Sequence, residues 1–327
     1  MGLLTRKRKS RAPSEGARLF FVTDIHGSDR CFRKFLNAAV FYDAQYLVLG
    51  GDITGKTLVP IERTARGYRA RFRDHDYADL DDGGLAELEQ RIRDGGQYPV
   101  VGERDELLAL EDEGRRDEAF KRAVVESVTR WMRLAEERLA GTGVRCFVTP
   151  GNDDFFEIDE PLRASSRVEF VEGRCVSLEG YEMITTGYSN ITPWDSPREL
   201  DEDALRARID AMYADVADPE RLIAVLHPPP YGTELDQAPA LDGELRVQHT
   251  GGQANMTSVG STAVRDFVLE RQPLLALHGH VHESRGAALL GRTLCLNPGS
   301  EYTEGILAGA LVTLADGAIA SHQFVSV

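Results

Sequence analysis

Short apolar runs recur along the chain, and each one is followed at once by polar residues. Runs of this length with β-branched members that end at Gly, Pro or a polar residue are typical of buried strands. We therefore predict strands at Leu19–Thr23, Tyr46–Leu49, Cys146–Thr149, Leu222–Leu226 and Leu274–Leu277.

Helical and turn patterns fill the intervals between these strands. The sequence predicts helices over about 28–40, 199–216 and 262–271, and a hairpin at 174–186 around Glu179-Gly180. Short strands close the chain, with turns at Gly291 and Asp316-Gly317. A βαβ alternation followed by hairpins predicts an α/β fold, in which two sheets pack as a β-sandwich flanked by helices.

The connection between the second and third predicted strands is unusually long. Leu58–Arg63 and Tyr68–Arg73 flank Ala65-Arg66-Gly67 in the manner of a β-hairpin. We expect residues 56–103 to be an inserted hairpin with a short acidic helical piece, inside a single domain at 18–327. Residues 104–140 are expected to hold an amphipathic helix, because apolar residues recur there at three- and four-residue steps: Phe120, Val124, Val128, Trp131, Ala135 and Leu139.

Arginines crowd the predicted hairpin. Solvated strand faces are the favoured explanation, while an anion-facing rim over an active site and a subunit contact stay open as alternatives. The residues are Arg63, Arg66, Arg69, Arg71 and Arg73.

Composition and charge narrow the class of protein. A chain of 327 residues with 42% hydrophobic content can bury a large core. Its net charge of −15 disfavours nucleic acid as a partner. No apolar stretch approaches the ~18 residues of a membrane span. The cysteines show no CxxC spacing and are expected to be buried thiols of a cytoplasmic protein: Cys31, Cys146, Cys175 and Cys295.

The first 17 residues differ from the rest of the chain. No apolar core follows their positive charges, which excludes a signal peptide. Arg6 stands where an acylation motif after Met1-Gly2 needs Ser or Thr. We expect a disordered basic tail, with weak attachment to a polyanion as the alternative. The charges are Arg6, Lys7, Arg8, Lys9 and Arg11 against Glu15.

The residues that follow the five strands are of the types that bind metal ions. In an open α/β sheet, ligands bind outside the carboxyl ends of the strands, so these residues are expected to converge at one edge. One such cluster alone would be weak, since Gly-Asp and Gly-Asn-Asp-Asp are common in turns. Together they indicate a metal site: Asp24-Ile25-His26, Gly51-Asp52, Gly151-Asn152-Asp153-Asp154, His227 and Gly279-His280-Val281-His282.

The spacing of these residues fits two ions. Asp24 and His26 lie two apart on an extended strand end and point the same way, whereas His280 and His282 in a turn can serve different ions. Two ions about 3.5–4 Å apart need a bridging carboxylate. Asp52 is the natural bridge, because the two glycines before it allow close approach of the backbone. The histidines outside this pattern are assigned to structure: His75, His249, His278 and His322.

The order DxH, GD, GN, a single His and GHxH resembles the calcineurin-like metallophosphoesterase superfamily, whose fold is a four-layer αββα sandwich. The resemblance covers roughly 18–55 and 144–327. Phe21–Gly27, Gly50–Lys56 and Asn297–Ser300 further resemble small bacterial and archaeal phosphoesterases related to cyclic-nucleotide phosphodiesterases. The chain lacks the GDxVDRG and GNHE forms typical of protein Ser/Thr phosphatases.

The resemblance implies a set of ligands and metals. The first ion would take Asp24, His26, Asp52 and His282, and the second Asp52, Asn152, His227 and His280. Mn²⁺ is the expected metal for both sites, with Fe, Zn, Ni and Mg as alternatives.

One position departs from the family pattern. The usual third motif is GNH followed by Asp or Glu, and its His helps to position the phosphate and to protonate the leaving group. Here Asp153 takes the place of that His, and Asp154 matches the residue after it. We therefore assign Asn152 and Asp153 to the catalytic site and expect weak leaving-group protonation, because a carboxylate is ionised at neutral pH.

The resemblance and the ligand pattern together predict a phosphoester hydrolase with a binuclear metal centre. Metal bridging would give a hydroxide poised for in-line attack on phosphorus. The substrate is expected to be a small phosphoester, with a diester slightly preferred over a monoester. A catalytically weak binding scaffold, a phosphomonoesterase and a nuclease stay open as alternatives, and so does assembly as a homo-oligomer.

Overall fold

The computed structural model describes residues 16–327. The basic tail predicted at 1–17 therefore lies outside the described residues except at its end, where Ala17 already belongs to the first strand. Within residues 16–327, no helix is long and apolar enough to cross a bilayer.

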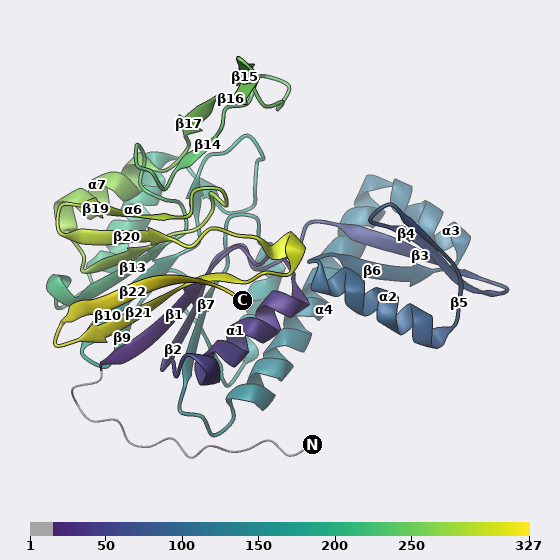
Figure 1. Cartoon of the computed structure of the whole chain (residues 1–327), viewed down its shortest axis with the longest axis horizontal. Helices are drawn as coiled ribbons and strands as arrows, with labels where there is room; N and C mark the ends of the chain where they lie inside the picture. The colour runs from purple at the N-terminus through teal and green to yellow at the C-terminus, as the bar shows by residue number, and fades with distance from the viewer. Residues whose placement is uncertain (1–15) are drawn as a thin grey trace.

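Two six-stranded sheets form the centre of the molecule (Figure 1). The first sheet has the order β22-β21-β1-β2-β7-β8, with β1 (Ala17–Val22), β2 (Tyr46–Gly50), β7 (Arg145–Thr149), β8 (Val168–Phe170), β21 (Ala308–Ala315) and β22 (Ala318–Ser326). The second has the order β19-β20-β18-β13-β10-β9, with β9 (Arg174–Leu178), β10 (Tyr181–Thr186), β13 (Leu222–Leu226), β18 (Leu275–Leu277), β19 (Gly286–Leu290) and β20 (Thr293–Asn297). All five strands predicted from apolar runs are present.

The central strands of each sheet are buried on both faces, which explains their unbroken apolar runs. In β1, Leu19 and Phe21 face the second sheet, while Phe20 and Val22 face the helices. Helices α1 (Asp29–Phe41), α4 (Glu113–Leu139) and α5 (Asp159–Ala164) cover the outer face of the first sheet. Helices α6 (Glu202–Tyr213) and α7 (Thr262–Arg271) cover the second. The predicted α/β fold of two packed sheets between helices is confirmed.

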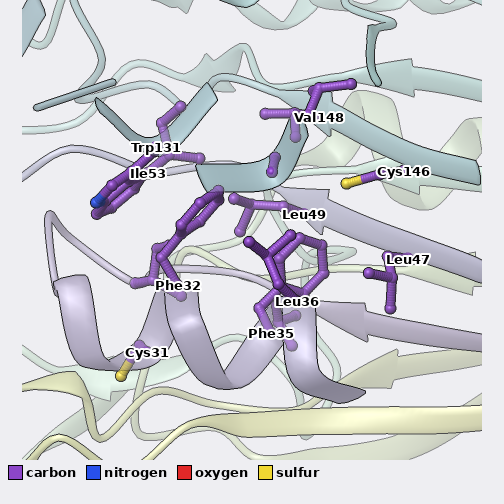
Figure 2. Close-up of a cluster of buried hydrophobic side chains, with 14 of the residues drawn as sticks. Cys31, Phe32, Phe35, Leu36, Leu47, Leu49, Ile53, Trp131, Cys146 and Val148 are labelled. Atoms are coloured by element: carbon purple, nitrogen blue, oxygen red, sulfur yellow. The ribbon is translucent and has the colours of Figure 1, made fainter. Parts of the chain in front are cut away.

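The packing of α1 shows how one outer layer is held. Phe32, Phe35 and Leu36 project from α1 toward Leu47 and Leu49 of β2 (Figure 2). Trp131 of α4 completes this cluster by stacking on Phe32, with ring centroids 4.4 Å apart, and its indole N–H donates to Asp29 at 2.6 Å. The long amphipathic helix expected within 104–140 is therefore present as α4, after the short helix α3 (Arg104–Leu108).

The insertion holds more structure than the hairpin and helical piece that we expected. The hairpin is present as β3 (Leu58–Thr64) and β4 (Gly67–Phe72), but it is the centre of a four-stranded sheet of order β5-β4-β3-β6. β5 (His75–Leu80) carries two aspartates and a histidine and β6 (Tyr98–Gly102) contains a proline, so neither shows the pattern of a buried strand. Helix α2 (Asp82–Asp94) packs on this sheet around Val59, Ile61, Phe72, Leu88 and Ile92. Figure 1 shows the insertion standing to one side of the two large sheets.

The hairpin arginines pair within or beside the insertion. Four of them lie near carboxylates of the insertion itself, in the pairs Arg63–Glu103, Arg66–Asp79, Arg69–Glu62 and Arg71–Asp74. Arg73 donates instead to the backbone oxygen of Thr303 at 2.7 Å. These contacts support the interpretation of the arginines as solvated strand faces.

The other helix and turn predictions differ from the structure mainly at their ends. The segment 199–216 begins as a two-residue strand, Glu199–Leu200, before α6 starts at Glu202. His249 lies on an exposed hairpin of a projecting arm formed by residues 237–258, and His75 and His322 lie on exposed strands. None of the four cysteines forms a disulfide, and three of them are buried.

Candidate metal centre

The central strands of both sheets are parallel, so their carboxyl ends meet at one edge. β1 pairs with β2 and β2 with β7 in parallel, and β13 pairs with β18 in the same way. The β1–β2 pairing continues past the strands, because the N–H groups of Asp24 and His26 donate to the oxygens of Gly51 and Asp52, each at 3.0 Å. The two loops that carry these side chains are therefore held side by side.

The first group of ligand atoms comes from Asp24, His26 and His282. His282 Nε2 lies 3.0 Å from His26 Nε2 and 3.3 Å from Asp24 Oδ1, and His26 Nε2 lies 3.9 Å from the same oxygen. Atoms bound at about 2.1 Å to one ion are about 3 Å apart when adjacent in an octahedral shell. The three atoms thus have spacings close to those of ligands of one ion.

The second group comes from Asp52, His227 and His280. His227 Nε2 lies 3.5 Å from Asp52 Oδ1, and His280 Nδ1 lies 2.9 Å from the amide oxygen of Asn152. The other ring nitrogen of His227 is 3.0 Å from the carbonyl oxygen of Gly50 and can only donate to it, which fixes the orientation of the ring.

Asp52 lies between the two groups. Its Oδ2 is 3.8 Å from His26 Nε2, whereas its Oδ1 faces His227. One carboxylate therefore presents an oxygen to each group, as a bridging ligand must.

An unpartnered ring nitrogen of His227 also indicates that the site can hold divalent metal ions. His227 Nε2 is buried and has no hydrogen-bond partner among residues 16–327. A buried polar atom without a partner is uncommon, and an ion would occupy its lone pair. Imidazole nitrogens with carboxylate and amide oxygens also suit a transition metal.

Mutual electrostatics already hold the carboxylates ionised. Burial raises the pKa of the Asp52 carboxyl, but the positive charge of His227 beside it outweighs this effect and holds the pKa well below the usual value. Burial lowers the pKa of His227, yet the charge of Asp52 brings it to about 9, while burial lowers the pKa of His26 and His280 to about 4. Metal ions bind neutral imidazoles, so an ion entering the second group would displace the proton of His227.

Several ligands hold unusual backbone conformations. Asp24, His26, Asp52 and His280 all have positive φ, between 37° and 67°. Such residues cost about 1–3 kcal/mol each and persist where the surroundings over-determine them. Gly51 allows the close approach expected of it, because its φ is +118° and a Cβ there would overlap the ring of His227.

The loop that carries Asn152 is fixed by two neighbours that the sequence did not single out for this role. The carboxylate of Asp154 accepts from the N–H groups of Ile53, Thr54 and Gly151, which ties this loop to the Asp52 loop. Arg198 is 1% exposed and donates to the oxygens of Asp154 and Phe155 at 2.8 and 3.0 Å. It also pairs with Asp159 at 2.6 Å.

The segment Asn297–Ser300 fixes the loop that carries His280 and His282. Asn297 donates to the oxygen of Val281 at 2.9 Å, and the hydroxyl of Ser300 donates to the oxygen of Asp24 at 2.6 Å. His278 is buried beside this loop, where Nδ1 meets the oxygen of Leu226 at 2.8 Å.

Asp153 lies at the edge of the metal centre. Its N–H donates to Asp52 Oδ1 at 3.1 Å, and its carboxylate forms an ion pair with Lys56. Ser196 donates to the other carboxylate oxygen at 2.6 Å. The ring of Tyr302 lies 4.8 Å from that of His26. The sequence placed Lys56 in a motif without assigning it a role, and nothing in the sequence around Ser196 or Tyr302 indicated a place at the site.

The structure brings the seven predicted ligands together at one edge of the two sheets. Their binding of metal stays a prediction. The three ligands from the second sheet come to the same place as the four from the first, as the strand-end rule requires.

Comparison with known proteins gives a family and a fold. The chain matches the model of the calcineurin-like phosphoesterases over residues 17–284. An uncharacterised protein of Methanocaldococcus jannaschii is 26% identical over 151 residues, which are 46% of this chain and 61% of that protein. The chain thus matches less than two thirds of that relative's length.

Two solved structures resemble the whole chain. One crystal structure has a TM-score of 0.58 and 17% identity, and the protein TT1561 of Thermus thermophilus has a TM-score of 0.54 and 13% identity. Each covers 95% of this chain and 98% of the other chain. At such identities the likeness shows the fold alone. Because the family model matches most of the sequence, this chain belongs to the calcineurin-like phosphoesterase family.

Proposed function

We propose that this protein hydrolyses small phosphoesters, diesters slightly in preference to monoesters, with two divalent metal ions. The observation that carries the proposal is the position of Asp52, whose two oxygens face the two groups of ligand atoms. A scaffold that bound no metal would have no need of this arrangement of buried charges, which is costly without ions.

Each of the two proposed ions would have its own set of ligands. Asp24, His26 and His282 would hold one ion, and Asn152, His227 and His280 the other, with Asp52 shared between them. When bound, the ions would lower the pKa of water toward neutrality and neutralise the charge of the phosphate. Two divalent cations with the carboxylates of Asp24 and Asp52 leave a formal charge of about +2. An acidic protein would therefore attract a phosphate at this edge.

Metal content and turnover test the proposal together. Protein loaded with Mn²⁺ should hold close to two ions per chain by elemental analysis and should hydrolyse bis(p-nitrophenyl) phosphate faster than p-nitrophenyl phosphate. Asp52→Ala should lose both ions, or nearly both, together with the activity. Asp266→Ala, which removes a carboxylate on the surface of α7, is the matched control and should keep both.

Two results would contradict the proposal. Saturation at one ion, with Asp52→Ala unaffected, would exclude the binuclear centre. Two bound ions without turnover of any aryl or cyclic phosphoester would favour a binding scaffold.

A further inference from the structure

The metal centre has a charged pair at its edge in the place where the resemblance expects a histidine. One carboxylate oxygen of Asp153 lies within 4.8 Å of the ligand atoms of His26 and Asp52. Its side chain is 17% exposed and faces the metal centre. An unpaired carboxylate in this position would repel a phosphate.

The Asp153 carboxylate is fixed by three partners. Ser196 Oγ donates to Oδ1 at 2.6 Å, and the amide of Asn152 donates to the same oxygen at 3.1 Å. The ammonium group of Lys56 pairs with Oδ2. Both oxygens are therefore engaged, and the orientation of the carboxylate is set by the loops around it.

The backbone before Lys56 is equally constrained. The N–H of Gly55 donates to the hydroxyl of Tyr98 at 2.7 Å, and a Cβ at Gly55 would overlap the carbonyl of Gly96. The Lys56 side chain itself is 54% exposed, so solvent and solutes can reach it. A fixed backbone with an accessible ammonium group is suited to meet a ligand that enters the site.

We propose that Lys56 binds the phosphate group of the substrate beside the metal centre and that Asp153 is the positioning residue that holds its ammonium group there. This inference rests on the proposed function. An ammonium group has three N–H donors, and its pair with Asp153 uses one. The others can reach phosphate oxygens, which lysine binds as a compact point charge. The ion pair thus places the Lys56 ammonium group beside the substrate phosphate, whereas Asp153 alone would only repel that phosphate.

The first test measures phosphate binding and turnover in Mn²⁺-loaded full-length protein. Lys56→Gln should weaken binding of inorganic phosphate about 10-fold or more and lower kcat/KM for bis(p-nitrophenyl) phosphate by about 10- to 100-fold, the range for loss of a hydrogen bond to a charged group. Its metal content should not change. Lys56→Arg, which keeps the charge, should recover part of the loss. Lys121→Gln removes a lysine that pairs with Glu157, a carboxylate outside the two ligand groups, and should leave every value at the wild-type level.

A double-mutant cycle tests the role of Asp153. Asp153→Asn alone should lower phosphate affinity, because Lys56 loses its anchor. In the Lys56→Gln background the same substitution should not weaken phosphate binding further and should recover part of it, since it removes the charge of an unpaired Asp153. If Asp153→Asn lowered the phosphate affinity equally in the wild type and in Lys56→Gln, the positioning role would be refuted.

The outcomes separate this inference from the proposed function. If Lys56→Gln binds phosphate as tightly as Lys121→Gln does, the inference is wrong even when the wild type is an active esterase. If the wild type binds phosphate through Lys56 but hydrolyses no ester, the proposed function is wrong and the binding role of Lys56 stands.

Discussion

Arg198 offers a sharp test of how the loop around Asn152 is held. Its guanidinium group lies inside the protein and makes three hydrogen bonds, two to backbone oxygens of residues 154 and 155 and one to Asp159. Its own backbone N–H also donates to the oxygen of Asn152 at 3.1 Å. Arg198→Met keeps much of the apolar stem but removes all three side-chain donors.

The expected cost follows from these contacts. Breaking a buried ion pair by removing one partner typically costs about 3–5 kcal/mol, because the remaining acceptors stay desolvated. Asp159 is 21% exposed and recovers some solvation, so we expect a loss near the lower end, about 3 kcal/mol. At roughly 2–4 °C for each kcal/mol in a chain of this class, the melting temperature should fall by about 6–12 °C.

Arg163 supplies the matched control. It pairs with the same carboxylate, Asp159, at 3.6 Å, but its side chain is 61% exposed. An exposed pair contributes about 0–1 kcal/mol, so Arg163→Met should cost less than about 1 kcal/mol. Urea unfolding gives the two free energies of unfolding, and Mn²⁺ titration should show weaker binding of the second ion in Arg198→Met alone. Equal losses of stability in the two variants would refute the reasoning from burial.

Two further predictions follow from the same site. Gly51→Ala places a methyl group against His227, so it should lose at least one bound ion by elemental analysis. Gly141→Ala, at another positive φ with open space around it, should cost only about 1–2 kcal/mol and keep both ions. Burial lowers the pKa of His278 to about 4, below its unfolded value of about 6.5, so its stabilising contribution is full above pH 6.5 and declines as the pH falls toward 4. Between pH 7.5 and 5.5 the free energy of unfolding of the wild type should therefore fall by about 1 kcal/mol more than that of His278→Gln in urea unfolding, and equal losses would contradict this assignment.

The strands and the ligand positions were predictable from local sequence. Strands buried on both faces are apolar at every position, and a parallel sheet places whatever follows them at one edge. β5 and β6 were not predicted, because they are not apolar at every position. β5 is an edge strand with charged side chains, and β6 carries Pro99, so neither has the composition of a buried strand.

The contacts that complete the site could not be predicted in this way. Lys56 and Asp153 are far apart in sequence, and so are Asn152 and Arg198, so their meeting depends on how whole elements pack. A single lysine after a Gly-rich turn, or a single arginine before a helix, has no pattern that specifies a partner. The insertion arginines illustrate the same limit, because their spacing gave no sign of which carboxylates they would meet.

The two groups of ligand atoms each draw on both sheets, and this bears on when a newly made chain can complete the predicted metal site. Asp24 and His26 lie in the first part of the chain, whereas His282 lies near its end. β1, which leads to Asp24, pairs with β2 on one edge and with β21, residues 308–315, on the other. A nascent chain that still lacks these segments offers only part of each ligand group. The two predicted ion sites, which need His280 and His282, can therefore be complete only after residues up to 282 have been made.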